Sequence, residues 1–270
     1  MSRELSNKCQ TMCHDPILKH WNQRAALADK AGSDDVIAKK IEIKAISNHI
    51  TDGMVVAEFG CGNAKTAITL RSQHNIELFC FDFSPEMIRH SATLVEKAGM
   101  TDHIHLAVCD VRSEPEIRQN FDLVYTERMI INLPDWETQA KAIQYLLKTL
   151  KPGGRYLMCE NSKDGLDALN SLRISVGLQS ISPPWHNVYL VDHLVASLKW
   201  PEARLVNVEP FSATYYFLSR VVNASMAALE KTTPAYDAPV NQLALKLPPF
   251  GDCSQGKLWV FEKDHVGSPT

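Results

Sequence analysis

The sequence predicts an α/β fold in which helices flank a doubly wound, mostly parallel sheet of seven strands. Three observations lead to this fold. Short apolar runs alternate with segments of helical periodicity between residues 36 and 160. Turn residues separate these segments, and 270 residues are enough to build one large core. Hydrophobic residues make up 45% of the chain and charged residues 22%, which excludes disordered, collagen-like and coiled-coil proteins.

The first half of the chain repeats a unit of strand, turn and helix. Isoleucines at helical spacing predict a helix over 36–50, which ends before a Thr-Asp-Gly turn. Ser84 supplies an N-cap with Pro85 at the first helical position, and Gly99 ends that helix. The expected strands are 54–59, 77–83, 103–108, 121–126 and 155–160, and the expected helices are 64–73, 85–99, 114–119 and 135–150, with a turn at 151–154.

The second half departs from this alternation. A helix is expected at 164–176, a proline-rich loop at 182–189, and strands at 203–211 and 257–263. Between those two strands, the stretch 219–255 contains a predicted helix at 220–231. So long a connection between sheet strands is typical of a segment that covers a site.

Charge and cysteine content narrow the class of partner. The formal net charge of −3 provides no basic field for nucleic acid or for anionic lipid. No apolar run is long enough to span a bilayer, and the opening residues lack a signal-peptide core, so we expect a cytoplasmic protein. Cys61, Cys80, Cys109 and Cys159 adjoin core strands and are expected to be free thiols. Cys9, Cys13 and His14 have no further ligand at metal-site spacing, and no metal is expected.

A glycine turn follows the first expected strand, where an open parallel sheet binds its ligands. Gly60 and Gly62 permit a tight turn and a close approach of the backbone to a ligand. Asp82 ends the next strand, 20 residues after Gly62, where a carboxylate can accept both hydroxyl groups of a ribose. The third glycine of the pyrophosphate-binding pattern is absent, and Glu58 would repel a pyrophosphate but could hold an ammonium group.

Five motifs in order resemble class I S-adenosylmethionine-dependent methyltransferases, which have a Rossmann-like fold. They are VVAEFGCG at 55–62, FDFSPEMI at 81–88, CDV at 109–111, FDLV at 121–124 and LKPGG at 150–154. The resemblance covers roughly residues 54–160, and Ala64 replaces the family's usual third glycine. It implies that S-adenosylmethionine is the cofactor and S-adenosylhomocysteine the product.

The resemblance also implies roles for individual residues, and the segment 16–26 is expected to fold over the cofactor with the aromatic face of Trp21 near the sulfonium. Those expected to bind the cofactor are Trp21, Glu58, Gly60, Cys61, Gly62, Asp82, Phe83, Met87, Asp110, Val111 and Glu127. Glu58 and the glycine turn would face the methionine part, Asp82 the ribose, and Asp110 with Val111 the adenine. The whole chain, 1–270, is then one methyltransferase domain, with an N-terminal helical lid (1–50), a cofactor-binding core (51–163) and acceptor-binding helical insertions with the last strands (164–270).

The expected acceptor side carries the candidate catalytic residues. The loop 182–189 combines prolines and Trp185 with His186, the first candidate base, and Tyr189. Glu160 ends the fifth strand and is either a second candidate base or a helix cap. Arg128 follows the fourth strand and could bind a carboxylate or phosphate of the acceptor through two hydrogen bonds. A structural ion pair between Arg128 and Glu127 is the alternative. Packing into the core is the competing interpretation for Trp21 and for the loop 182–189.

Tyr215 and Tyr216 are further candidates to line the pocket, from the sixth strand. The resulting hypothesis is methyl transfer to a small-molecule acceptor, with O-methylation slightly ahead of N-methylation because His186 and Glu160 offer bases. An NAD(P)-dependent oxidoreductase of the same fold and a non-catalytic, cofactor-binding regulatory protein stay open as alternatives. The sequence leaves the acceptor and the choice between monomer and homodimer open.

Overall fold

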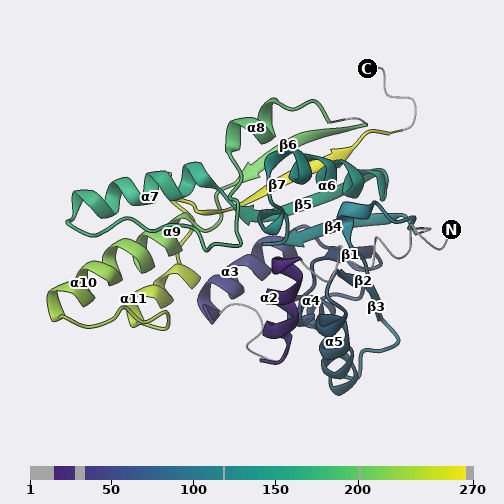
Figure 1. The fold of residues 1–270 in the computed structure, drawn as a ribbon, viewed down its shortest axis with the longest axis horizontal. Coiled ribbons are helices and arrows are strands. Elements are labelled where there is room, and N and C mark those ends of the chain that lie inside the picture. Colours follow the sequence, from purple (N-terminus) through teal and green to yellow (C-terminus); the bar gives the residue numbers. More distant parts are fainter. Residues whose placement is uncertain (1–14, 28–33, 118, 201, 266–270) are drawn as a thin grey trace.

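The computed structural model describes residues 15–27, 34–117, 119–200 and 202–265. Its centre is a seven-stranded sheet with the strand order β3-β2-β1-β4-β5-β7-β6 (Figure 1). The strands are β1 (Val55–Phe59), β2 (Glu77–Asp82), β3 (Ile104–Val108), β4 (Phe121–Glu127), β5 (Leu150–Asn161), β6 (Ala203–Glu209) and β7 (Gly256–Lys263). Strands β1 to β5 pair in parallel, and β7 is antiparallel to both of its neighbours. The predicted fold class is confirmed.

Helices cover both faces of this sheet. They include α2 (Pro16–Ala25), α3 (Val36–Ser47), α4 (Lys65–Gln73), α5 (Pro85–Lys97), α6 (Trp136–Lys148), α7 (Lys163–Ser175) and α8 (Asp192–Ser197). On one face, apolar side chains of α3, α4 and α5, such as Ile46 and Leu70, pack against Leu78 and other strand residues. On the opposite face, α6 and α8 contribute Ile143 and Val195 to a second core. The sheet is therefore the middle of three layers.

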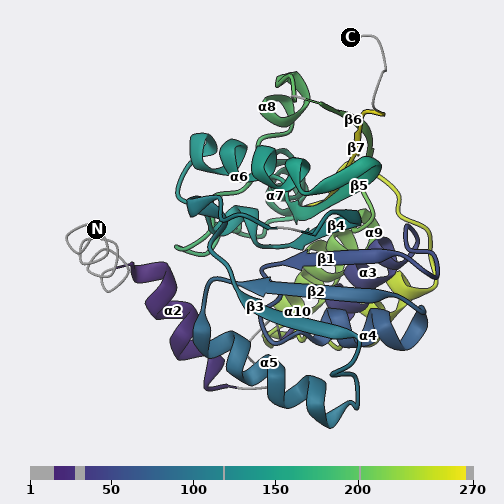
Figure 2. The ribbon, with the colours of Figure 1, turned by 90° about the vertical axis from the view of Figure 1, so that its right-hand side faces the viewer.

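The order of the strands reverses beside β1. The chain builds β1, β2 and β3 toward one edge and then returns to place β4 on the other side of β1. In sheets of this kind, a crevice opens at the carboxyl ends of the strands where the order reverses. Helix α2 lies beside α5 near this end of the sheet (Figure 2).

A group of helices projects from one side of the sheet (Figure 1). It comprises α7, α9 (Ala213–Tyr216), the π-helix η4 (Phe217–Val222), α10 (Asn223–Glu230), α11 (Pro239–Gln242) and η5 (Leu243–Leu245). The helix predicted at 220–231 therefore starts earlier, at Ala213. Tyr215 and Tyr216 lie on α9 and not on the sixth strand, which corrects that prediction. Both are buried, and the Tyr215 hydroxyl donates to Asp35, the N-cap of α3, at 2.5 Å.

Two further predictions in the sheet region were wrong. No helix forms at the described residues of 114–119; a short 3₁₀ turn, η2 (Val111–Ser113), precedes them. Pro115 disfavours helical geometry at Glu114, which takes a left-handed φ of 44°. The predicted turn at 151–154 lies inside β5, where the pairing register with β4 shifts after Phe121. The extra residues form a bulge rather than ending the strand.

The described cysteines, Cys61, Cys80, Cys109, Cys159 and Cys253, are buried free thiols, as predicted for the first four. Cys9, Cys13 and His14 lie outside the described residues. Within the described ranges, no group of three His, Cys, Asp or Glu side chains is placed to hold a metal ion. None of the described helices combines the length and apolar character that a membrane crossing requires.

Candidate active site

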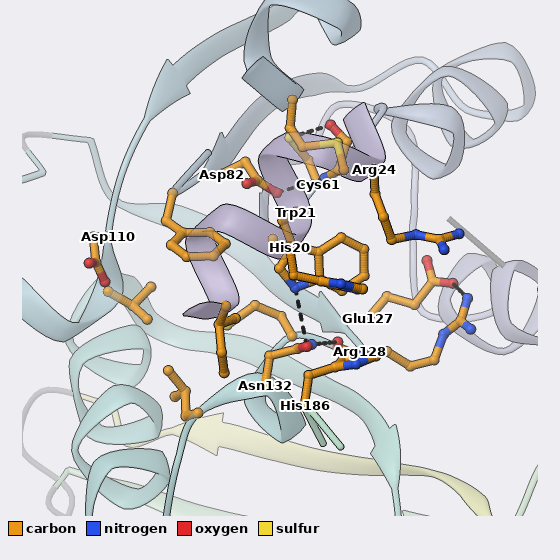
Figure 3. A pocket seen from close by; sticks show the side chains of 18 of the residues that line it. His20, Trp21, Arg24, Cys61, Asp82, Asp110, Glu127, Arg128, Asn132 and His186 are labelled. Carbon is orange, nitrogen blue, oxygen red and sulfur yellow. Dashed lines mark hydrogen bonds and ion pairs between the residues drawn. The ribbon is translucent and has the colours of Figure 1, made fainter. Parts of the chain in front are cut away.

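A cavity of about 360 Å³ opens at the carboxyl ends of β1 to β4, where the strand order reverses. Helix α2 contributes Ile17, His20, Trp21 and Arg24 to its wall. Asp110 lies at one end of the cavity, and Glu127 and Arg128 lie at the other (Figure 3). The cavity is therefore elongated across the tips of neighbouring strands.

The turn after β1 brings the backbone to the cavity wall. Gly60 has a φ of +79°, and a Cβ atom there would lie 2.4 Å from Cγ of Met129. Only glycine therefore fits at this position. Gly62 also has a positive φ, and Ala64 adopts a left-handed φ of 56° at the start of α4, although it carries a side chain. Ala64, which replaces the usual third glycine, therefore holds a backbone conformation that is strained for a residue with a side chain.

Asp82 ties the tips of β1 and β2 together. One carboxylate oxygen accepts the Gly62 N–H and the other accepts the Ser84 N–H, both at 2.9 Å. Burial raises the pKa of Asp82 to about 6, although the two hydrogen bonds act to lower it. Because this pKa is still below 7, the carboxyl group is mostly ionised at neutral pH. A carboxylate has about four lone-pair sites. Each oxygen therefore keeps acceptor capacity for a ligand in the cavity.

Asp110, at the end of the cavity away from Glu127 and Arg128, is held by Arg112. The Arg112 guanidinium donates to both Asp110 oxygens, at 2.9 and 2.7 Å. Its remaining terminus donates to Asp15 at 2.6 Å, and Asp15 caps the first turn of α2. The same guanidinium lies 5.6 Å from the centre of the Phe83 ring. This network fastens the N-terminus of α2 to the loop after β3.

Glu127, at the end of β4, is the centre of a buried ionic network. Its carboxylate accepts from Lys39 of α3 at 2.6 Å and from Thr66 of α4 at 2.7 Å. Burial would raise the pKa of Glu127, but the Lys39 and Arg128 cations outweigh it and lower the pKa to about 2. Arg128 also lies 3.2 Å from Glu42, whose pKa burial raises to about 8. This network fixes α3 and α4 against the sheet beside the cavity.

Glu58 also lines the cavity, and its carboxyl group is buried. Burial raises its pKa to about 8, and the Glu127 carboxylate acts in the same direction. In the ligand-free protein at neutral pH, Glu58 is therefore mostly protonated. A cation in the cavity would favour the ionised form of Glu58 and lower this pKa.

Helix α2 is anchored over the middle of the cavity. The Trp21 indole N–H donates to Asn132 at 3.3 Å, and the Ser84 hydroxyl donates to Asn22 at 2.5 Å. Both partners of α2 belong to loops at the carboxyl ends of strands. Trp21 lines the cavity and packs against Ala25 and Met87, apart from the cores on the two faces of the sheet.

His186 meets helix α2 across the cavity. Its ring stacks on His20 with centroids 4.6 Å apart, and it is edge-on to Trp21 and Trp185 at 5.8 and 5.4 Å. The backbone of its loop is fixed because the Val188 N–H donates to the Ile131 carbonyl at 2.7 Å. Burial lowers the pKa of His186, and His20 and Arg24 add to the effect. These effects favour the neutral form of the imidazole.

Glu160 and Tyr189 do not line the cavity, in contrast to the prediction. The buried Glu160 carboxylate accepts the backbone N–H groups of Met129 and Ile130, each at 3.0 Å, and that of Ile131 at 3.4 Å. These bonds hold the loop after β4, so the alternative interpretation of Glu160 as a capping acid fits the geometry. The Tyr189 hydroxyl accepts a hydrogen bond from the Gln255 side chain at 3.2 Å. The Tyr189 side chain packs against two hydrophobic clusters, one under α6 and one in the group of projecting helices.

Replacing Glu160 by alanine is expected to lower the free energy of unfolding by roughly 2–4 kcal/mol, because three buried N–H groups lose their acceptor. Chemical denaturation measures this loss. Glu160→Gln keeps one acceptor oxygen and should lose less stability. An alanine variant as stable as the parent protein would refute this structural role.

All eleven residues predicted to bind the cofactor line this one cavity, as do Arg128 and His186. Sequence reasoning did not find several others: His20, Arg24, Lys39, Arg112, Asn132 and Asn187. One signal was available for α2, since Ile17, His20, Trp21 and Arg24 recur at the spacing of a single helix face. Arg112 and Asn132 lie in loops, where no periodicity marks a functional side chain.

The strand order, the glycine turn and the acidic residues at the ends of β2 and β3 agree with what the resemblance to class I S-adenosylmethionine-dependent methyltransferases implies. Residues 56–154 match the family model described as a methyltransferase domain, so this segment is a methyltransferase domain. The family match covers four of the five sequence motifs in full and most of the first one.

Curated relatives are distant. The chain is 22% identical over 139 residues to 27-O-demethylrifamycin SV methyltransferase of Amycolatopsis mediterranei (strain S699), an alignment that covers 50% of this chain and 47% of the relative. A demethylmenaquinone methyltransferase of Leptospira interrogans is 24% identical over 123 residues, and the alignment covers 45% of this chain and 48% of that one. The chain thus spans about half the length of the curated relatives it matches.

Solved structures share the fold over more of the chain. The N-methyltransferase NodS from Bradyrhizobium japonicum WM9, solved with S-adenosylhomocysteine, is 13% identical with a TM-score of 0.56, over 93% of this chain and 99% of that chain. At such identity, this likeness establishes the fold alone.

Proposed function

We propose that this chain transfers the methyl group of S-adenosylmethionine to a small-molecule acceptor, with oxygen favoured over nitrogen as the attacked atom. The observation that carries the proposal is Asp82, a carboxylate bonded to the glycine turn that keeps acceptor capacity for a ribose. The family match of residues 56–154 supports the reaction class.

The residues around the cavity fit this cofactor from end to end. Asp110, Val111 and Phe83 would hold the adenine, Asp82 the ribose, and the glycine turn with Glu58 the methionine part. Because Gly60 is packed against Met129, the backbone itself forms the wall at the turn. A cation at the turn would favour the ionised form of Glu58, which suits an ammonium or sulfonium group and would repel the diphosphate of a nicotinamide dinucleotide.

S-adenosylmethionine supplies a methyl carbon that is already electrophilic, so the chain's own task is to position the acceptor and to exclude water. Orientation of this kind contributes roughly 7–11 kcal/mol to catalysis. Helix α2 is placed for it, since Asp15, Trp21 and Asn22 fasten the helix across the cavity. We assign α2 as the lid of the site, and His186 opposite it as the base.

A small acceptor is supported by the charge of the chain. The net charge of −3 gives no support to a nucleic acid acceptor. O-methyltransferases and an N-methyltransferase appear among the relatives and neighbours; the neutral His186 imidazole favours an acceptor that must lose a proton.

Binding of S-adenosylhomocysteine at pH 7 is expected to release close to one proton from Glu58. The pKa of about 8 makes this group protonated in the free protein, and the ammonium group of the ligand favours its ionised form. Affinity should therefore rise with pH up to about 8 and level off above it. Titration calorimetry of S-adenosylhomocysteine binding in buffers of different ionisation enthalpy measures how many protons the protein releases.

Glu58→Gln should abolish the release, and Glu96→Gln, an exposed substitution on α5, should leave it intact. Proton uptake by the parent protein, or an unchanged release in Glu58→Gln, would contradict the placement of the ligand's cationic end at Glu58.

Titration of the full chain with S-adenosylhomocysteine and, in parallel, with NADH tests the proposed function. We expect binding of the first and none of the second. Preferential binding of NADH would replace the proposal with the oxidoreductase alternative. Binding of S-adenosylhomocysteine without turnover of any acceptor would favour the non-catalytic alternative.

A further inference from the structure

Arg112 saturates the carboxylate of Asp110, the acid expected at the adenine. The backbone N–H and the Nε of Arg112 donate to Oδ1 of Asp110 at 3.0 and 2.9 Å. The same Nε and Nη2 donate to Oδ2 at 3.0 and 2.7 Å. A carboxylate offers about four lone-pair sites, and these contacts fill them. Asp82 differs, because each of its oxygens accepts one backbone N–H and keeps capacity for the ribose.

The guanidinium of Arg112 also covers the ring beside Asp110. It lies over the aromatic ring of Phe83, 5.6 Å from the ring centre, which is within the range of a cation–π contact. Phe83, Asp110 and Arg112 all line the cavity. The proposed function assigns to the adenine a hydrogen bond to Asp110 and a packing contact with Phe83. Arg112 therefore makes, in this structure, both of the contacts that are assigned to the nucleobase.

Arg112 can leave Asp110 and still keep an ionic partner. Its Nη1, which does not contact Asp110, donates to Asp15 of helix α2 at 2.6 Å. The Arg112 side chain is also 32% exposed, so its guanidinium can be solvated. An arginine side chain stays charged in proteins, and a buried charge that loses its partner is strongly unfavourable. The pair with Asp15 and the access to solvent avoid that penalty.

We propose, on the basis of the function proposed above, that Arg112 competes with the adenine of the cofactor for Asp110 and Phe83 and thereby sets the selectivity of the site for the nucleobase. The amino group of adenine takes an oxygen of Asp110, and the guanidinium moves toward Asp15 and solvent. A nucleobase with a carbonyl oxygen in place of this amino group binds differently. Its oxygen accepts from Arg112, whereas an uncovered Asp110 carboxylate would repel it.

The affinities of the full chain for two ligands test the proposal. The probes are S-adenosylhomocysteine and S-inosylhomocysteine, in which a carbonyl oxygen replaces the amino group of the adenine. Titration calorimetry gives the ratio of the two affinities. We expect Arg112→Ala to raise this ratio in favour of S-adenosylhomocysteine by roughly fivefold or more, because the amino group gains an uncovered Asp110 and the carbonyl oxygen loses its donor.

Two comparison variants separate this effect from a looser lid. Asparagine caps a helix as well as aspartate does, so Asp15→Asn removes the ion pair with Arg112 and keeps the cap of α2. A looser lid weakens the binding of both ligands alike, and the ratio should not rise in Asp15→Asn. Arg155→Ala removes a half-exposed arginine that pairs with Glu262 outside the cavity, and it should keep the parental ratio.

A rise smaller than this in Arg112→Ala, an unchanged ratio or a fall would overturn the competition between Arg112 and the adenine. Arg112→Met keeps the aliphatic stem without the guanidinium, and it provides the same test should Arg112→Ala not fold. Failure of S-adenosylhomocysteine to bind the parent protein would instead refute the function proposed for the chain. The two failures are therefore separable.

Discussion

Asp82→Ala is expected to bind S-adenosylhomocysteine more than tenfold less tightly than the parent protein. The variant loses the acceptor for the ribose hydroxyl groups and leaves the Gly62 and Ser84 N–H groups without their partner. A lost buried hydrogen bond costs about 1–3 kcal/mol, and each 1.4 kcal/mol is tenfold in affinity. Titration calorimetry measures the effect.

The controls for Asp82 separate binding from folding. Asp82→Asn keeps one acceptor oxygen and should fall between the parent and the alanine variant. Asp102→Ala removes an exposed carboxylate from the turn after α5 and should bind normally. If Asp82→Ala folds and binds the ligand with parental affinity, the ribose assignment is wrong.

His186→Ala should lower turnover of a hydroxyl acceptor roughly 100-fold, the lower end of the range for general acid–base catalysis. Cofactor affinity should change only severalfold, because His186 contacts the lid through rings and not through an ionic bond. Steady-state kinetics with the best acceptor, together with cofactor titration, distinguish the two effects.

The pH profile gives a second test of His186. Its depressed pKa predicts that turnover in the parent falls as the pH drops below the ordinary histidine value of about 6.5, since the imidazole must be neutral to take the proton. His193→Ala should retain both the rate and the profile. Parental turnover in His186→Ala would reduce this residue to a packing role.

The sheet was predictable because its strands carry a local signal. Each parallel strand is a short apolar run that ends in turn residues, and β1, β2 and β3 lie within a residue or so of their predicted bounds. The acids Asp82 and Asp110 follow from the same logic, since carboxyl ends of neighbouring parallel strands share an edge. The prediction that both carboxylates lie in one cavity therefore depended on the strands alone and not on the helices.

The lid side was harder to predict because its contacts depend on tertiary docking. The stacking of His20 on His186 joins residues from helix α2 and from a loop far along the chain, and neither sequence segment specifies the other. Glu160 shows the converse difficulty. Its place at the end of a strand suggested a base, but the loop after β4 folds back and takes up its oxygens with backbone N–H groups.

Local strain also escaped prediction. Arg128 has a left-handed φ of 53° at the tip of β4, where its guanidinium turns toward Glu42. Non-glycine residues in this region are uncommon and are concentrated at functional sites. Neither Arg128 nor its direct neighbours, Glu127 and Met129, is a glycine or an asparagine that would indicate such a turn.

A crystal structure of the chain with S-adenosylhomocysteine is the most direct test of the account. We expect the adenine between Asp110 and Phe83, the ribose hydroxyl groups on Asp82, and the sulfur facing the side of the cavity lined by His186. A ligand bound elsewhere, or a cavity that accepts a dinucleotide diphosphate at the glycine turn instead, would contradict it.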